Sequence, residues 1–118
     1  MLIEMLLGKI HRGAVTECRL EYEGSLTVDR DLIEQAGLRI HQKVQVLNLN
    51  NAQRIETYLI EGPRGSGQIA VNGAAARLFY KGDRVIVAGF ALLDAAELNG
   101  FQPRVIVLNE QNEVLETH

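Results

Sequence analysis

Two Gly-Ser pairs in the chain differ in the structure that their neighbours predict. Gly24-Ser25 lies between segments that favour β-strand, whereas Gly65-Ser66 lies in a stretch rich in glycine and proline. A serine hydroxyl can attack the carbonyl carbon before it when both groups are held at attack distance. Glycine permits backbone angles closed to other residues, so the Gly24 carbonyl can turn toward the Ser25 hydroxyl. The local sequence leaves open a plain hairpin turn, the commoner use of these residues, and a peptide bond that breaks.

The second pair serves as an internal control for that choice. Pro63 and the glycines of residues 62–67 predict a mobile, solvated turn, and mobility opposes a reaction that needs one fixed geometry. The stretch has no Lys-Ser or Lys-Thr ending and no long helix after it, so it does not match a phosphate-binding loop. We therefore expect no cleavage at Gly65-Ser66.

Two cations and a phenol are further candidates for chemistry. Lys9 and Arg54 fall in different predicted strands, and either they are solvated strand charges, the commoner case, or they hold a small dianion together. Lys9 as the lysine that binds pyridoxal phosphate is disfavoured, because the chain lacks a phosphate cradle. A phenol can donate its proton to a carbanion as a general acid. Tyr58 is therefore a candidate acid, and an ordinary aromatic of an amphipathic strand is the alternative.

The metal-ligating residues are few and far apart. The chain has three histidines, His11, His41 and His118, and one cysteine, Cys18. None of them has the close spacing of a zinc site, so no metal is expected. His11 differs from the others in lying near Lys9, where it can help to position a ligand.

Length and composition narrow the class of protein. A chain of 118 residues predicts one domain over residues 1–118. The net charge of −3 and the lack of any run of Lys or Arg disfavour nucleic acid as a partner. No apolar run approaches the roughly 20 residues of a membrane span, and Glu4 within the apolar start argues against a signal peptide. The lone cysteine predicts no internal disulfide and favours the cytoplasm.

Short strands separated by turns dominate the hydrophobic pattern, which favours a compact barrel because a barrel removes exposed edges. The strands are expected at residues 3–9, 14–21, 25–28, 44–48, 54–60, 68–71, 84–91 and 104–108. Short helices are expected at residues 30–36, capped by Asp29 and ended by Gly37, at 72–79, and at 94–98 before Asn99-Gly100. Residues 111–118 are mostly polar and are expected to fray.

Residues 54–60 raise a question of strand geometry. Alternation places Thr57 on one side of the strand, with Ile55 and Leu59, and Tyr58 on the other side. The two side chains serve one pocket only if a bulge re-aims one of them or if different subunits use them.

Four segments of the chain, taken in order, resemble those of the pyruvoyl-dependent aspartate 1-decarboxylases. They are residues 8–12 (GKIHR), 22–25 (YEGS), 54–58 (RIETY) and 71–76 (VNGAAA). The resemblance covers almost the whole chain and makes the breakable bond at Gly24-Ser25 the preferred interpretation. Departures from the commoner pattern are minor: Leu47 stands where some relatives have an aromatic residue, and Gly13 follows the first segment.

The resemblance implies a mainly β fold, a small double-psi β-barrel with a few short helices, assembled as a homotetramer. It implies that the chain cleaves itself between Gly24 and Ser25, into residues 1–24 (the β chain) and residues 25–118 (the α chain). The Ser25 hydroxyl attacks the Gly24 carbonyl to give an ester. Elimination then leaves a dehydroalanine, which hydrolyses to an N-terminal pyruvoyl group. Whether a helper protein accelerates this maturation stays an open question.

The resemblance also implies roles for individual residues in the conversion of L-aspartate to β-alanine and CO2, a step of pantothenate synthesis. Lys9 and Arg54 bind the substrate carboxylates, Thr57 stabilises the oxyanion of self-cleavage, and Tyr58 donates the final proton. Further residues near the pocket are Asn72, Gly73, Ala74, Ala75, Tyr22 and His11. The pyruvoyl ketone forms a Schiff base with the substrate amine and accepts the electrons left by CO2, so neither a metal nor pyridoxal phosphate is implied.

Two other functions stay open at this point. One is a pyruvoyl decarboxylase for another amino acid, which the two cations disfavour because a basic substrate calls for acidic residues. The other is a non-catalytic, oligomeric β-barrel of the DNA-binding regulator type, which the net charge of −3 disfavours.

Overall fold

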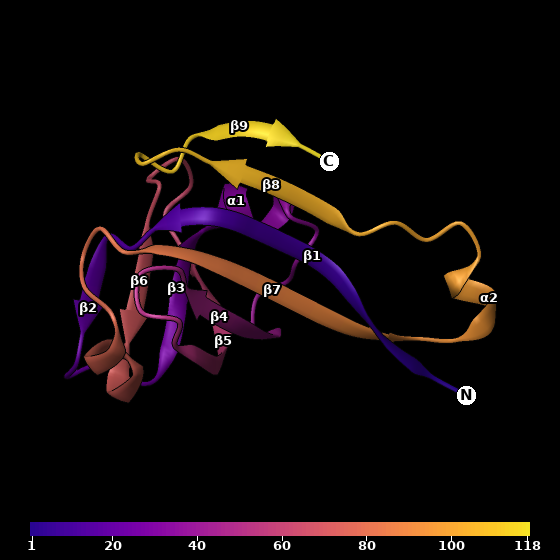
Figure 1. Cartoon of the computed structure of the whole chain (residues 1–118), viewed down its shortest axis with the longest axis horizontal. Helices are drawn as coiled ribbons and strands as arrows, with labels where there is room; N and C mark the ends of the chain where they lie inside the picture. Colours follow the sequence, from indigo (N-terminus) through magenta and orange to yellow (C-terminus); the bar gives the residue numbers. More distant parts are fainter.

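The computed structural model describes residues 1–118, which form one nine-stranded sheet in the order β2-β6-β3-β5-β4-β7-β1-β8-β9 (Figure 1). The strands are β1 (Ile3–Ala14), β2 (Glu17–Arg19), β3 (Ser25–Asp29), β4 (Lys43–Asn48), β5 (Arg54–Gly62), β6 (Ile69–Asn72), β7 (Arg84–Leu93), β8 (Arg104–Leu108) and β9 (Val114–Thr117). The helices are α1 (Arg30–Gln35), the 3₁₀ helix η1 (Gly73–Leu78) and α2 (Ala95–Leu98). No helix is long and apolar enough to cross a membrane.

The sheet closes into a barrel because β2, at one end of the strand order, directly follows β1, which lies near the other end. Only Val15 and Thr16 separate β1 from β2, and the Thr16 amide donates to the Ile69 carbonyl at 2.7 Å. β2 pairs with β6, whereas β1 pairs with β7. The continuous segment 3–19 therefore joins the two sides of the sheet, and β8 and β9 lie outside this closed ring on β1. The predicted small, mainly β barrel is confirmed.

The barrel core follows from alternation along the strands. In β4, Val44 and Val46 are buried while Gln45 is only half-buried, as expected for a strand with one face inward. β3 is different, because all five of its residues are buried. It is flanked by β5 on one side and β6 on the other, so it has no exposed edge. Three of its buried residues are polar, and each needs a hydrogen-bond partner.

Local signals placed the helix ends correctly. The Asp29 carboxylate accepts from the Asp31 amide at 2.8 Å at the start of α1, and Gly37 after it has a φ of +71°. Asp94 and Glu97 form a capping box at α2. The predicted strand at 14–21 was too long, because only Glu17–Arg19 pairs and the chain then turns.

The expectation that residues 111–118 fray was wrong. Val114–Thr117 forms β9 and pairs antiparallel with β8. The reversal depends on the Asn109 side chain, which accepts from the amides of Gln111 and Glu113, both at 2.9 Å. Asn112 completes the turn with a φ of +61°, a conformation that asparagine tolerates.

Residues 63–67 form a largely exposed loop that is more constrained than the sequence predicts. The Asp29 carboxylate accepts from the amides of Gly65 at 3.1 Å and Gly67 at 2.9 Å. Arg64 forms ion pairs with Asp31 and Glu34 of α1. The loop is therefore tied to the end of β3 and to the helix that follows it.

The side chain of Asn112 connects this loop to the barrel. It bonds both the amide of Ala14, at 2.7 Å, and its carbonyl, at 2.9 Å, and it donates to the Gly67 carbonyl at 2.7 Å. We predict that Asn112→Ala lowers the free energy of unfolding by about 2–4 kcal/mol, since it leaves buried backbone groups without partners. Urea unfolding at one fixed protein concentration measures the change. Glu110→Ala, on the same exposed turn, is the control, and equal midpoints for the two variants would contradict the assignment.

Candidate functional site

Ser25 begins β3 and is held in a buried polar cluster. Its residue is 3% exposed, and that of Asn72, its pairing partner on β6, is 1% exposed. The Asn72 Nδ2 donates to Ser25 Oγ at 3.0 Å and to Thr27 Oγ1 at 2.8 Å. Ser25 Oγ donates in turn to the Glu23 carbonyl at 3.3 Å. We call Ser25, Thr27 and Asn72 the serine cluster, and it fixes the position of the Ser25 hydroxyl.

The strand order excludes the plain hairpin at Gly24-Ser25. A hairpin would pair β2 directly with β3, but β6 lies between them. β2 runs parallel to β6, and β3 runs antiparallel to it on the other side. The Gly24-Ser25 bond therefore joins an exposed crossing segment to a fully buried strand.

The glycine whose backbone geometry matters is Gly73 rather than Gly24. The expected special angles at Gly24 are absent, since its φ is not positive and an added Cβ there would meet nothing within 4 Å. Gly73 has a φ of +79°, and a Cβ on it would come within 2.7 Å of the Gly24 Cα. The start of η1 thus packs directly on the backbone of Gly24, which only a glycine at position 73 allows.

Gly65-Ser66 has none of this environment. Ser66 is exposed, and its hydroxyl donates to the Pro63 carbonyl at 2.6 Å within the loop. The two Gly-Ser pairs therefore differ in burial and in the partners of the hydroxyl.

β5 is regular where Thr57 and Tyr58 lie. Its pairing with β4 runs from Leu47 opposite Arg54 to Lys43 opposite Tyr58 without a register shift. No bulge re-aims either side chain, so Thr57 and Tyr58 lie on opposite faces of the strand. The proposal of a bulge is excluded.

The two residues nevertheless border one hollow, because this part of β5 is an edge. β3 pairs with β5 only from Leu26 opposite Leu59 onward. Before that point β5 has no neighbour on the β3 side, and a hollow of about 340 Å³ is lined by Lys43, Glu56, Thr57 and Tyr58. Ser25 and Tyr58 are the residues that directly precede Leu26 and Leu59, the first pair of this parallel register.

Lys9 and Arg54 share the outer face of the barrel. Lys9 lies opposite Ala88, which also lies opposite Gln45, so these three side chains form a row across β1, β7 and β4. The Arg54 guanidinium donates to Gln45 Oε1 at 2.8 Å and so reaches this row. Two strand spacings, about 10 Å, separate Gln45 from Lys9. Only the small Ala88 stands between them.

A second row on this face contains His11 and Leu47, which both lie opposite Ile86. We call Lys9, His11, Leu47 and Arg54 the cationic face. Leu47 also lies opposite Arg54, so its departure from the family pattern falls on this surface.

His11 lacks a partner on the cationic face. Its Nδ1 is buried and has no hydrogen-bond partner. Burial lowers the pKa of His11 below its usual value of 6.5, and the positive charges of Lys9, Arg12 and Arg84 lower the pKa further. The imidazole is therefore neutral at pH 7, in surroundings with an excess of positive charge.

The chain does not bring the cationic face to the serine cluster. Along the sheet, β5, β4 and β7 lie between β3 and β1, so Lys9 and Ser25 belong to different parts of the barrel. Arg54 lies on β5, the neighbour of β3, but the pairing of these two strands begins only at Leu59, five residues after Arg54. The remaining predicted residues lie on the side of Ser25. Ala74 is exposed and Ala75 half-buried in η1, and Tyr22 is exposed, with the Arg19 guanidinium 5.3 Å from its ring centroid.

Thr27 was missed by the sequence analysis. Its signal is the spacing of two from Ser25, which places both hydroxyls on one face of a strand, but threonine is also an ordinary strand residue. The burial of β3 and the partner Asn72 become visible only in the folded chain.

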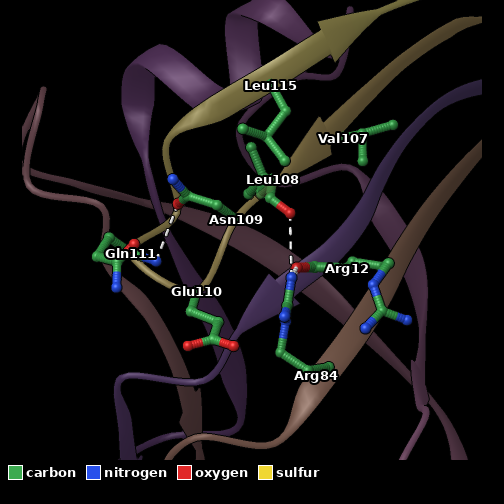
Figure 2. A pocket seen from close by; sticks show the side chains of 8 residues that line it. All are labelled: Arg12, Arg84, Val107, Leu108, Asn109, Glu110, Gln111 and Leu115. Carbon is green, nitrogen blue, oxygen red and sulfur yellow. Dashed lines mark hydrogen bonds between the residues drawn. The ribbon is translucent and has the colours of Figure 1, made fainter.

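A separate hollow of about 320 Å³ lies where the β8–β9 turn meets β1 and β7, and it contains none of the predicted site residues (Figure 2). The Arg84 guanidinium crosses it and donates to the carbonyls of Arg12 and Leu108. No group of three or more His, Cys, Asp or Glu side chains is placed to hold a metal ion.

The aspartate decarboxylase family model matches residues 1–115. The chain belongs to this family. It is 49% identical over 116 residues to an aspartate 1-decarboxylase of Sulfurimonas denitrificans, covering 98% of this chain and 96% of the relative. It is 52% identical over 113 residues to that of Leptospira biflexa (95% and 96%) and 49% identical over 110 residues to that of Bacillus subtilis (93% and 87%). Membership of an enzyme family sets aside the DNA-binding barrel.

The charge around His11 gives a prediction for this aspartate decarboxylase homologue. We expect the His11 imidazole to titrate below pH 6.5, and Lys9→Met to raise its pKa without restoring 6.5, because burial is the larger cause. NMR titration of the ring protons, assigned with His11→Asn, measures both values. A midpoint at or above 6.5 in the unmodified chain would contradict both the burial and the positive surroundings assigned to His11.

Proposed function

We propose that this chain is an aspartate 1-decarboxylase, which converts L-aspartate to β-alanine and CO2 in the cytoplasmic synthesis of pantothenate, after cutting itself between Gly24 and Ser25. The observation that carries the proposal is the buried serine cluster directly after an exposed glycine. The names of the relatives support the substrate.

Self-cleavage requires the Ser25 oxygen to act as a nucleophile. It bonds to the Gly24 carbonyl carbon, the Gly24–Ser25 C–N bond breaks, and the hydroxyl proton ends on the freed nitrogen, which leaves an ester. The Asn72 N–H, 3.0 Å from the oxygen, stabilises the negative charge that develops as the proton leaves. Elimination from this ester removes the Ser25 α-proton and frees fragment 1–24 with the Ser25 oxygen in its new carboxylate. Hydrolysis of the remaining dehydroalanine then releases ammonia and leaves fragment 25–118.

The residues around Ser25 fit a pyruvoyl group at position 25. The ketone oxygen would come from water and lie on the Ser25 Cα, because Oγ leaves with the Gly24 carboxylate. The Asn72 Nδ2, which bonds Oγ in the uncut chain, is a donor within the same buried cluster. The Asn72 Oδ1 is buried without a partner and can accept from a bound amine. When present, the pyruvoyl group takes up the electrons released as the α-carboxylate leaves as CO2. The hollow lined by Thr57 and Tyr58 gives the substrate a place near the start of the β3–β5 pairing, which begins one residue after Ser25.

The remaining roles follow from charge and position. Lys9 and Arg54 bind the two carboxylates, and the cations that surround the neutral His11 favour an anionic substrate over a basic one. The Tyr58 hydroxyl, at the hollow, donates a proton to the carbon that loses CO2. Gly73 holds η1 against Gly24, which keeps the pocket wall of Asn72, Ala74 and Ala75 beside the reacting residue.

We further propose that two subunits of a homotetramer complete each site. A second copy brings its cationic face to the serine cluster, because one chain holds these groups apart. Exposed apolar residues support such assembly. β1 and β7 extend together beyond the barrel toward α2 (Figure 1), and this arm exposes Met1, Leu2, Ile3 and Leu92.

The cleavage site is tested with two matched serine variants. We predict that Ser25→Ala yields a folded, inactive and uncut chain, because no hydroxyl is left to attack. Ser66→Ala is the control and should be cut and active like the unmodified chain. Intact-mass analysis, with borohydride trapping in the presence of aspartate, reads the scission site and the substrate adduct together. Normal cutting of Ser25→Ala, or a fragment that ends at Gly65, would disprove the assignment.

The shared site is tested by complementation. Lys9→Ala and Tyr58→Phe should each be cut but inactive, whereas their co-expression should restore about a quarter of the sites, since a site of two subunits draws each residue from a random neighbour. The control co-expresses Tyr58→Phe with Ser25→Ala. Both residues are proposed to come from the same subunit of a site, so this pair should restore no activity. β-Alanine formation is the measurement. Failure of the first pair to complement would place Lys9 and Tyr58 in one subunit.

A further inference from the structure

We infer that Thr27 is a positioning residue for self-cleavage: its hydroxyl holds the Asn72 amide in the orientation that points an N–H at the Ser25 oxygen. The inference rests on the self-cleavage proposed above and adds a residue that does not touch the breaking bond.

The geometry begins with β3. Ser25 and Thr27 are two residues apart and lie on the same face of the strand. On β6, Asn72 lies opposite Ser25, and Ala70 lies opposite Thr27. Because Ala70 is small, nothing longer competes for the Thr27 hydroxyl. The Asn72 amide lies between the two hydroxyls, and its shorter bond, 2.8 Å against 3.0 Å, goes to Thr27.

These two bonds alone determine how the Asn72 amide is turned. An asparagine side chain rotates about its last torsion with only a broad preference, and its Oδ1 has no partner here. Both protons of Nδ2 are used, one for each hydroxyl. The bond to Ser25 changes during the reaction, because that oxygen moves toward the Gly24 carbonyl. The bond to Thr27 is the one that persists.

The consequence is electrostatic. Negative charge develops on the Ser25 oxygen as its proton leaves, in surroundings that are almost fully buried. A donor already oriented toward that charge stabilises it without reorganisation, and the low local dielectric strengthens the interaction. Without the Thr27 hydroxyl, the Asn72 amide keeps an unpaired N–H and can turn away from Ser25.

The experiment compares Thr27→Val, which keeps the shape but removes the hydroxyl, with Thr27→Ser, which keeps the hydroxyl. Freshly purified full-length chains are incubated, and the fraction cut at Gly24-Ser25 is followed by intact mass. We expect Thr27→Val to slow cutting about tenfold, less than the loss of a direct oxyanion donor, and Thr27→Ser to cut at nearly the unmodified rate. Should Thr27→Val not fold, Thr27→Ala gives the same comparison.

Thr16→Val controls for general loss of stability. The Thr16 hydroxyl also makes two hydrogen bonds to β6, both to the backbone of Ile69 at 3.0 Å, but it does not contact Asn72. It should lower the thermal midpoint without slowing cutting at a temperature where it is folded.

The outcomes separate this inference from the proposal beneath it. Cutting of Thr27→Val at the unmodified rate, or of Thr27→Ser as slowly as Thr27→Val, would overturn the role of the hydroxyl. An unmodified chain that is active yet never cut would instead overturn self-cleavage itself, and the role of Thr27 with it.

Discussion

The rest of the structure depends on the burial of three polar side chains along β3. Ser25, Thr27 and Asp29 alternate on this strand, which is covered on both faces and flanked on both edges. A buried polar group without a partner costs about 1–3 kcal/mol, so each of the three must be matched from elsewhere in the chain. The Asn72 amide donates to Ser25 and Thr27, and Asp29 accepts from the amides of Asp31 and of the 63–67 loop.

The hydrogen-bond partners of these polar residues differ between the two ends of β3. At its last residue, Asp29 caps α1 and holds Gly65 and Gly67, and Asn112 ties the same loop to β1. At its first residue, the side-chain hydrogen bonds are those of the serine cluster and the bond from Ser25 Oγ to the Glu23 carbonyl. The backbone at Gly24 can therefore rearrange while the far end of the strand keeps the barrel intact. The packing of the barrel around β3 therefore also fixes the position of the Ser25 hydroxyl.

The parts of this architecture that the sequence could predict are those with local causes. The cap at Asp29 and the left-handed Gly37 follow from neighbouring residues, and alternation locates most strands. β9 could not be found, because residues 111–118 are mostly polar and the strand forms only against β8, through a turn that Asn109 arranges. Asn72 was reached through family resemblance alone, since it lies 47 residues from Ser25. Thr27 escaped notice because a strand threonine is unremarkable until its burial is known.

The separation of the cationic face from the serine cluster has a chemical consequence. Self-cleavage needs only groups that one chain already holds together. They are the Ser25 hydroxyl, its donor Asn72, and Gly24, on which Gly73 packs. Decarboxylation also needs cations to bind a dianion. Lys9 lies on β1, with β5, β4 and β7 between it and β3, and Arg54 lies at the start of β5, five residues before the pairing with β3 begins at Leu59. With the two sets on different surfaces, the charges of Lys9 and Arg54 are matched to the substrate and not to the internal rearrangement. Substitutions on the cationic face should therefore change turnover while leaving the cutting rate alone, provided that subunit contacts merely bring the two surfaces together.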